Sequence, residues 1–512
     1  MKKILVSGAS VVALAIAAPS LAQSVSDIDQ TGNGNGANVT QTGDNDSDVD
    51  QVGNSNTATV IQSGSDGVAG ILQTGDDNEA SIEQASIGGL ADIIQDGDDN
   101  IAEIDQEDTS PIAGGGAVIE DPEAFIDQAG NSNEATIEQT NSDSSFNLVT
   151  NVFQTGDDND SDVAQSALQP GSGELFAEVL QVDGATSTIT QLADAPGAVD
   201  QSAVVDQEGA QTSTITQTFV IGNSNTFSAT VFQRGTGNDS MISQSDLGPF
   251  DATADSALFA TVTQTGDGNT SELSQNNREA TATILQSGND NLSIASQTSS
   301  TNIITVTQSG DDNTSAVEQA MGSSSEATVL QESDNAESTV FQSGRFDEVF
   351  VNQLTGSDES TSEVTQNGAP AFANTFNLAT VTQTAEGNGS IIEQTDFNGD
   401  ATVNQSGPSN AALIEQIGTV AGGTNTASID QSGEFNEAEI SQNGSLNLAT
   451  IDQQGDDNLA TTDQTGAGSI SDILQTGNLN TAEVTQLNDG NTSNIIQSGN
   501  GGTVIVTQGS SS

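Results

Sequence analysis

Glutamine recurs about every eleven residues along most of this chain. The regular runs lie between positions 30 and 106, 264 and 319, and 431 and 508. Between successive glutamines the residues follow the pattern x-G-x-x-N-x-A-x-(I/V)-x, as between Gln73 and Gln84. Chains with a fixed period are better described by repeats than by domains. The spacing therefore predicts one repeating structural unit along nearly the whole chain.

The repeat unit alternates strictly over seven residues. From 78 to 84, Asn, Ala, Ile and Gln alternate with Glu, Ser and Glu. Such alternation places the two sets of side chains on opposite faces of a β-strand and does not fit a helix. The remaining four residues, 74–77, are Thr-Gly-Asp-Asp and have turn composition. Each unit is thus predicted to be one strand followed by one tight turn.

The outward residue before the glutamine shows that the true period is two units. It is apolar at Leu72 and Ile94 but acidic at Glu83 and Asp105. Two kinds of strand therefore alternate, and one rung contains about 22 residues in two 11-residue units. We expect an all-β, amyloid-like β-solenoid of stacked strand-turn-strand rungs, about twenty in number. Parallel stacking at ~4.8 Å would place identical positions above one another.

Stacked rungs give the repeated amides and glycines a function in self-assembly. A buried amide without a partner costs ~1–3 kcal/mol, and in-register stacking satisfies it. Glycine suits the turn because it tolerates positive φ. The expected amide ladder comprises Gln73, Asn78, Gln84, Gln95, Asn100, Gln106, Gln264, Asn269, Gln275, Gln308, Asn313, Gln319, Gln475, Asn480 and Gln486. The expected turn glycines are Gly75, Gly97, Gly266, Gly310 and Gly477.

Acidic pairs in the turns are candidate gatekeepers against premature assembly. Stacked carboxylates ~5 Å apart in water repel by a little under ~1 kcal/mol, which is comparable to one amide ladder bond. Low pH or divalent cations should then accelerate assembly. The alternative is that these acids are solvated turn residues that keep the chain soluble. The residues are Asp76, Asp77, Asp98, Asp99, Asp311, Asp312, Asp456 and Asp457.

The outward apolar residues form a possible stripe for lateral packing, if they share one sheet face. The alternative explanation is the strand propensity of half-exposed positions. These residues are Leu72, Ile94, Phe153, Leu180, Phe232, Leu285, Leu330, Phe341, Leu474 and Ile496.

The N-terminal segment 1–22 has the features of a secretory signal peptide. Two lysines precede an apolar run that ends in Ser20-Leu21-Ala22. The run is too short for a spanning helix and no later segment is as apolar, so we expect no membrane span in the mature chain. The mature repeat region is expected to be 23–512. Irregular inserts interrupt the spacing near 107–127, 166–176, 245–258 and 367–376.

Composition excludes several classes of function. The 512 residues contain 73 acidic and 5 basic side chains, with a formal net charge of -68 and no His, Cys, Trp or Tyr. Nucleic acids and anionic membranes require clustered Lys or Arg. Catalysis at neutral pH would lack histidine, cysteine and tyrosine. We therefore expect no enzyme activity, no catalytic residue, no cofactor and no dedicated metal site.

The constellation of Gln73, Gly75, Asn78, Ala80 and Gln84 resembles the curlin repeat, the strand-turn-strand unit of curli. Curli are extracellular amyloid fibres of bacterial biofilms. The resemblance implies a secreted subunit that polymerises with itself or with other curlin-like subunits. It further implies an outer-membrane secretion channel, a nucleator and a fimbrial or matrix location outside a Gram-negative-type bacterium.

The strand pattern is still intact at Thr503–Gln508, so we expect an uncapped edge and end-to-end growth. The predicted function is to build or nucleate extracellular curli-like fibres for biofilm matrix, adhesion and cell aggregation. The alternative is a monomeric or cell-attached acidic β-solenoid that acts as an adhesin or surface-layer component.

Overall fold

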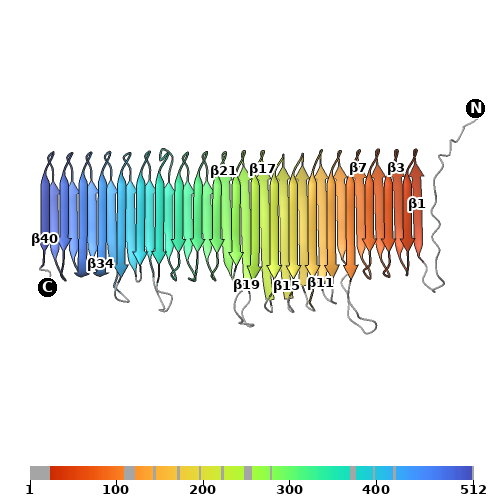
Figure 1. The fold of residues 1–512 in the computed structure, drawn as a ribbon, viewed down its shortest axis with the longest axis horizontal. Helices are drawn as coiled ribbons and strands as arrows, with labels where there is room; N and C mark the ends of the chain where they lie inside the picture. Colours follow the sequence, from red (N-terminus) through yellow and green to blue (C-terminus); the bar gives the residue numbers. More distant parts are fainter. Residues whose placement is uncertain are drawn as a thin grey trace, which may run out of the picture. The chain divides into compact units, whose positions relative to one another are not determined.

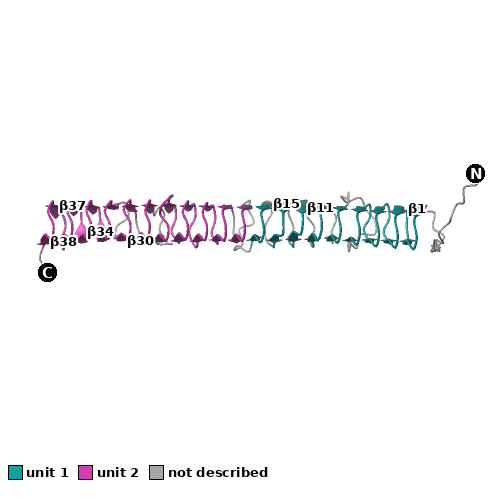
Figure 2. Ribbon diagram, turned by 90° about the horizontal axis from the view of Figure 1, so that it is seen from above, with its two compact units in different colours: residues 1–262 teal, residues 263–512 magenta. Residues whose placement is uncertain are grey.

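A computed structural model describes residues 24–108, 122–141, 146–169, 173–194, 198–220, 224–246, 256–276, 279–368, 376–395, 398–418 and 423–509. The chain divides into two units, residues 1–262 and 263–512 (Figure 2), and each is considered by itself. The predicted signal peptide at 1–22 lies outside the described residues. No helix that could cross a membrane is found in the described ranges.

In each unit the strands alternate between two parallel sheets, which we name the odd sheet and the even sheet after the strand numbers (Figure 1). In the first unit the odd strands are β1 (Val25–Thr31), β3 (Asp46–Val52), β5 (Val68–Thr74), β7 (Leu90–Asp96), β9 (Glu123–Ala129), β11 (Phe146–Thr155), β13 (Gly173–Val182), β15 (Ala198–Glu208) and β17 (Ser224–Arg234). Its even strands are β2 (Gly36–Gln41), β4 (Thr57–Gln62), β6 (Glu79–Gln84), β8 (Ile101–Asp108), β10 (Glu134–Asn141), β12 (Asp160–Ala167), β14 (Thr186–Ala193), β16 (Thr212–Phe219) and β18 (Asp239–Asp246).

Strand β19 (Ser256–Thr265) contains the boundary between the units. In the second unit the odd strands are β21 (Ala280–Ser287), β23 (Ile303–Gln308), β25 (Glu326–Gln331), β27 (Glu348–Gln353), β29 (Leu378–Gln383), β31 (Gly399–Gln405), β33 (Asn425–Gln431), β35 (Leu448–Gln453), β37 (Ile470–Gln475) and β39 (Thr492–Gln497). Its even strands are β20 (Thr270–Asn276), β22 (Leu292–Gln297), β24 (Thr314–Gln319), β26 (Glu337–Gln342), β28 (Thr361–Asn367), β30 (Gly389–Thr395), β32 (Ala411–Gly418), β34 (Glu437–Ser445), β36 (Leu459–Ala467), β38 (Thr481–Gln486) and β40 (Thr503–Gln508).

Each strand pairs with the strand two places along the chain. Strand β5 pairs with β7 in parallel, with Gln73 opposite Gln95, and β6 pairs with β8, with Gln84 opposite Gln106. The chain forms about 19 turns of about 23 residues each. The predicted all-β solenoid with a two-strand rung is confirmed, and the mean turn slightly exceeds 22 residues because some connections are longer.

The core between the sheets is narrow and built from the inward positions. In β6, Ala80, Ile82 and Gln84 are buried, whereas Glu79 and Glu83 are exposed. Burying one isoleucine or valine side chain contributes ~1.5–3 kcal/mol. The alternation in sequence is therefore the direct cause of the strand and of the face that it buries.

The two kinds of connection differ in length. After an odd strand the next inward residue usually follows within five positions, as from Gln73 to Asn78 or from Gln475 to Asn480. After an even strand the connection ranges from Gln84–Gly89 to Gln106–Pro122. All four predicted inserts lie after even strands, between β8 and β9, β12 and β13, β18 and β19, and β28 and β29. Their centres, 109–121, 170–172, 247–255 and 369–375, lie outside the described residues.

Several rungs of the first unit extend the core toward these longer connections. Strands β13, β15 and β17 have 10 or 11 residues, and the even strands between them have 8. The position six residues before the glutamine, usually small or Asn, is here Leu148, Leu175 or Phe227. Phe227 packs edge-on against Phe219 at 6.3 Å between ring centroids, and both are buried. Longer strands thus carry additional core under the longer connections.

Candidate functional site

The glutamines form continuous hydrogen-bond ladders inside each unit. The amide Nε2 of Gln73 donates to Oε1 of Gln95 at 2.9 Å, and Gln95 donates to Gln128 at 2.9 Å. The Gln73 amide nitrogen also donates to the carbonyl of Thr57 at 3.0 Å. The same bond joins Gln84 to Gln106, Gln106 to Gln139, Gln264 to Gln286, Gln275 to Gln297, Gln308 to Gln331, Gln319 to Gln342, Gln475 to Gln497 and Gln486 to Gln508.

The predicted asparagines cap turns as well as stacking on one another. The backbone N–H and Nδ2 of Asn100 both donate to Oδ1 of Asn78, at 3.0 and 3.1 Å. The Asn78 Nδ2 donates to the carbonyl of Gly97 in the next turn at 2.7 Å. Asn269 likewise donates to the carbonyl of Gly288, and the N–H groups of Asn313 and Asn480 donate to the asparagines one rung earlier. Within the described residues, Nδ2 of Asn313 and Asn480 lacks a partner.

The turn glycines are required mainly by close stacking of the backbone. A Cβ on Gly75 would overlap the carbonyl oxygen of Gly97, and one on Gly97 that of Gly130. Gly75, Gly97 and Gly266 have φ of 120°, 137° and 107°. Gly310 and Gly477 do not have positive φ, so the expected conformational reason is wrong there. Their Cβ atoms would overlap the carbonyl oxygens of Ser333 and Gly499.

The two acids of each turn occupy different environments. The first acid accepts a hydrogen bond from the turn one rung earlier: Asn54 N–H donates to Oδ1 of Asp76, and Asp76 N–H donates to Oδ1 of Asp98, both at 2.7 Å. Asp311 and Asp456 accept equivalent bonds from the N–H groups of Asn289 and Glu434. The second acids are exposed and have a left-handed backbone conformation, with φ between 54° and 59°; they are Asp77, Asp99, Asp312 and Asp457. Sequence reasoning missed these hydrogen bonds between the first acids and the backbone of the preceding turn. The sequence feature that could have indicated them is the constant position of an Asp or Asn directly after the turn glycine.

The even sheet of the first unit carries a further acidic row that the sequence reasoning did not assign. Glu83, Asp105 and Glu138 stand opposite one another on β6, β8 and β10. Partial burial, followed by the charges of Glu83 and Glu138, raises the pKa of Asp105. Like-charge stacking of carboxylates therefore also occurs on a sheet face.

Asp347 is a buried acid at a position where other rungs place asparagine or serine. Its Oδ1 accepts hydrogen bonds from Asn377, from Nδ2 at 3.1 Å and from the backbone N–H at 3.3 Å. Burial raises the pKa of Asp347 to about 7, and the bonds from Asn377 and the Gly344 amide only partly oppose that rise. Among the described residues, no donor makes a well-formed hydrogen bond to its Oδ2, which is buried.

The outward apolar residues do not form a single stripe. In the first unit Leu72, Ile94, Phe153, Leu180 and Phe232 all lie on the odd sheet. In the second unit Leu285, Leu330, Leu474 and Ile496 lie on the odd sheet, whereas Phe341 lies on the even sheet. Phe341 was therefore wrongly grouped with the others: Gln342 follows Gln331 by one 11-residue unit, so the strand of Phe341 joins the opposite sheet from the strand of Leu330.

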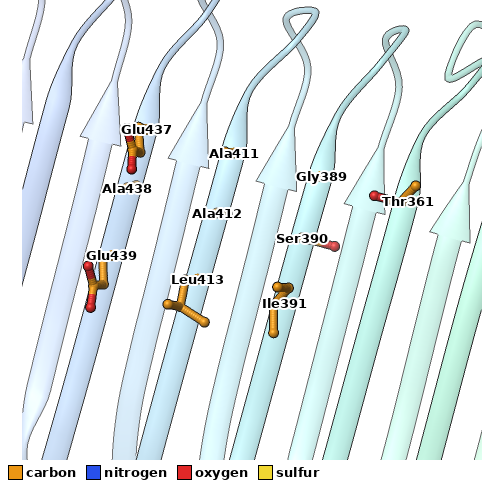
Figure 3. Close-up of a pocket in the computed structure, with 10 residues that line it drawn as sticks. All are labelled: Thr361, Gly389, Ser390, Ile391, Ala411, Ala412, Leu413, Glu437, Ala438 and Glu439. Atoms are coloured by element: carbon orange, nitrogen blue, oxygen red, sulfur yellow. The ribbon is translucent and has the colours of Figure 1, made fainter.

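An open hollow of ≈ 250 Å³ lies on the outer face of the second unit's even sheet (Figure 3). Small residues, Gly389 and Ala411, form its floor beside Ile391 and Leu413. The carboxylates of Glu437 and Glu439 stand on one side. The functional groups of its lining are the hydroxyls of Thr361 and Ser390 and the two carboxylates. In the described ranges no cluster of three or more acids is arranged to hold a metal ion.

Comparison with protein families identifies the repeat. The model of the curlin associated repeat matches residues 44–85, 278–310, 398–433, 422–455 and 455–487. These segments contain the glutamine, glycine and asparagine ladders in both units. No curated protein matches the chain. The matches agree with the geometry of the rungs, and the chain accordingly carries curlin associated repeats in both units.

Proposed function

We propose that this protein is a secreted structural subunit that builds or nucleates extracellular curli-like amyloid fibres. These fibres would serve the biofilm matrix, adhesion and cell aggregation. Residues 1–22 would direct export, and an outer-membrane channel and a nucleator would be its partners. The role requires neither catalysis nor a cofactor.

The observation that carries the proposal is the chemical identity of successive rungs. Each rung presents a glutamine donor and acceptor and a row of strand N–H and C=O groups at the same positions as its neighbours. A rung of a second copy therefore matches the hydrogen-bonding pattern of any exposed rung. Strand addition of this kind satisfies amides that would otherwise cost ~1–3 kcal/mol each when buried.

Templated growth is the experiment that tests this function. Residues 23–512 would be diluted from denaturant, and thioflavin fluorescence followed with and without preformed seeds. We expect a lag that seeds of the same protein abolish and seeds of an unrelated amyloid do not. Rapid folding to a β-rich monomer with no dye signal would contradict the proposal.

Both acids of each turn are the proposed gatekeepers, and the exposed second acids can be replaced without removing the hydrogen bonds that the first acids accept. Asparagine also tolerates the left-handed conformation, so replacing these acids by asparagine removes charge without changing the backbone preference. The lag should shorten for the variant with Asp77→Asn, Asp99→Asn, Asp312→Asn and Asp457→Asn. Acidification from pH 7 to pH 4, or added calcium, should likewise shorten the lag of the wild type. Unchanged lag times would leave these acids as solubilising residues only.

The acidic outer face of the even sheet favours a second candidate function. Stacked carboxylates such as Glu83, Asp105 and Glu138 keep copies apart, as expected of a monomeric or cell-attached adhesin. Seeding separates the two, because only the fibre subunit recruits its own kind.

A further inference from the structure

The outer face of the odd sheet in the first unit is apolar from β5 to β13. At the three outward positions that precede each glutamine, nine of the fifteen side chains are apolar: Val68, Leu72, Leu90, Ile94, Phe125, Val149, Phe153, Phe176 and Leu180. We name this set the aromatic face. At the same three positions on the even strands β6 to β14, eight of the fifteen side chains are acidic: Glu79, Glu83, Glu103, Asp105, Glu134, Glu138, Asp160 and Asp162. The unit is therefore two-faced.

The apolar side chains of the aromatic face fall into two contiguous groups, on β5–β7 and on β9–β13, and Glu123 and Asp127 of β9 stand between the apolar residues of β7 and those of β11. The rings of Phe125 and Phe153 lie 5.5 Å apart. In register, Phe153 stands opposite Leu180 and Val149 opposite Phe176. Leu72 and Leu180 are each 40% exposed. Contiguous exposed apolar surface of this kind marks an interaction site more often than scattered side chains do.

Some acidic side chains on this sheet are partly buried or paired with a cation. Asp92 fills the space beside Gly70, where a Cβ would overlap its Oδ1. Beyond β13, Asp206 is paired with Arg234 at 2.9 Å, and the Arg234 guanidinium lies 4.1 Å from the centroid of the Phe232 ring. Glu123, Asp127 and Glu178 remain, with Asp96 and Glu174 near the strand ends, and partial burial raises the pKa of Asp127.

We propose that the aromatic face binds the same face of a second copy of this chain. Two copies repel least through this face, because the opposite sheet carries eight acids and this face four at the three outward positions before each glutamine. The five strands from β5 to β13 present ~24 Å by ~20 Å at ~4.8 Å per strand, or ~480 Å² per copy. A standard stable interface buries ~800 Å² per partner, so we expect this contact to belong to the small, reversible interfaces. A symmetric pair would use one patch twice.

This lateral contact goes beyond the proposed growth by strand addition, and its test does not require that growth. The test compares wild type with F125T/F153T/F176T, since threonine keeps strand propensity while removing apolar area. The matched control is I101T/M241T, which removes two exposed apolar side chains from the even sheet of the same unit. Sedimentation equilibrium of the refolded full chain gives the monomer–dimer Kd, and circular dichroism with a thermal midpoint verifies the fold.

We expect the wild type and the control to dimerise with the same Kd and the triple variant to weaken dimerisation at least tenfold. If the triple variant fails to fold, L72T/L180T replaces it, because both leucines are substantially exposed. A monomeric wild type, or equal Kd values for all variants, overturns the proposal. Loss of adhesion to an apolar surface without any change in self-association would also overturn it and identify a different occupant.

Fibre images make the two proposals separable. Seeded fibres that remain single filaments in the wild type would overturn the lateral contact and leave templated growth intact. Dimers without seeded growth would support the lateral contact and overturn templated growth. For fibres that bundle, the triple variant should elongate at the wild-type rate but form single filaments.

Discussion

The two ends of the strands in this solenoid obey different rules. The connections after odd strands are short and almost constant, and neighbouring turns contact each other through glycine backbone and the Oδ1 atoms of the first acids. The connections after even strands differ widely in length, and in the first unit the core extends beneath them through Phe219 and Phe227. A repeat protein can therefore keep one edge regular for stacking while the other edge takes up sequence variation.

The largest expected effect concerns the extended core at the variable edge. Phe227→Ala should leave a cavity beside Phe219 and lower the free energy of unfolding by ~3–5 kcal/mol. Chemical denaturation of the refolded chain measures it. Met241→Ala on the neighbouring strand β18 is the control, because its side chain is 44% exposed, and its cost should be far smaller. Equal costs would mean that the longer connections do not depend on the extended core.

The buried acid at the same edge should make stability pH-dependent. The unfolded Asp347 releases its proton near pH 3.8 but the folded one only at about 7, so the folded state binds more protons between these values. Stability from this group is consequently full below pH ~4, declines as the pH rises and is lowest above pH 7. Asp347→Asn should stabilise the chain by up to ~4 kcal/mol at pH 8 and have little effect at pH 4.

The decisive measurement is the difference in free energy of unfolding between the wild type and Asp347→Asn as a function of pH, because the titration of the other acids cancels in this difference. A pH-independent difference would show that Asp347 is not the titrating group.

An insertion compares the two edges directly. Gly-Ser-Gly-Ser between Asp98 and Asp99 should break the bonds that join this turn to Asp76 and Ser132, at a cost of ~2–3 kcal/mol. The same insertion after Gln169, in the connection that follows β12, should cost ~0.6 kcal/mol or less. Thermal midpoints of the two variants measure the difference. If both insertions are tolerated equally, hydrogen bonds between neighbouring turns do not restrict the length of the connections after odd strands.

The smallest effect isolates the stacking of glycine backbone. Gly477→Ala should cost ~1–3 kcal/mol, because its Cβ would overlap the carbonyl oxygen of Gly499. Gly499→Ala is the matched control: it has the same place in the next turn, with no described atom within 4 Å of the new Cβ. Hydrogen exchange of the neighbouring turn amides would detect the first change and should detect little for the second.

The repeat made much of the fold predictable from sequence. Alternation in segments such as 78–84 predicted the strands, and the difference between Leu72 and Glu83 predicted two kinds of strand. The order of pairing followed, since identical positions then stack at every second strand. The glutamine positions, and hence the Gln73–Gln95 bond, required only the spacing.

Other features depended on knowing which sheet each strand joins. Phe341 was placed on the wrong face because it was grouped by its apolar character, although its distance of one 11-residue unit from Leu330 already indicates the opposite sheet. The roles of Gly310 and Gly477 depended on the separation of neighbouring turns, which one repeat does not reveal. The protonation of Asp347 depended on burial at a position where asparagine is usual.

Pairing between every second strand also constrains how such a gene can lengthen. Duplication of a single 11-residue unit would move every later strand to the opposite sheet and exchange the two outer faces from that point onward. Duplication of 22 residues would leave each later strand on its own sheet. Viable length variants should consequently differ by whole pairs of units, and replication slippage by one unit should be eliminated by selection even though the repeat itself remains intact.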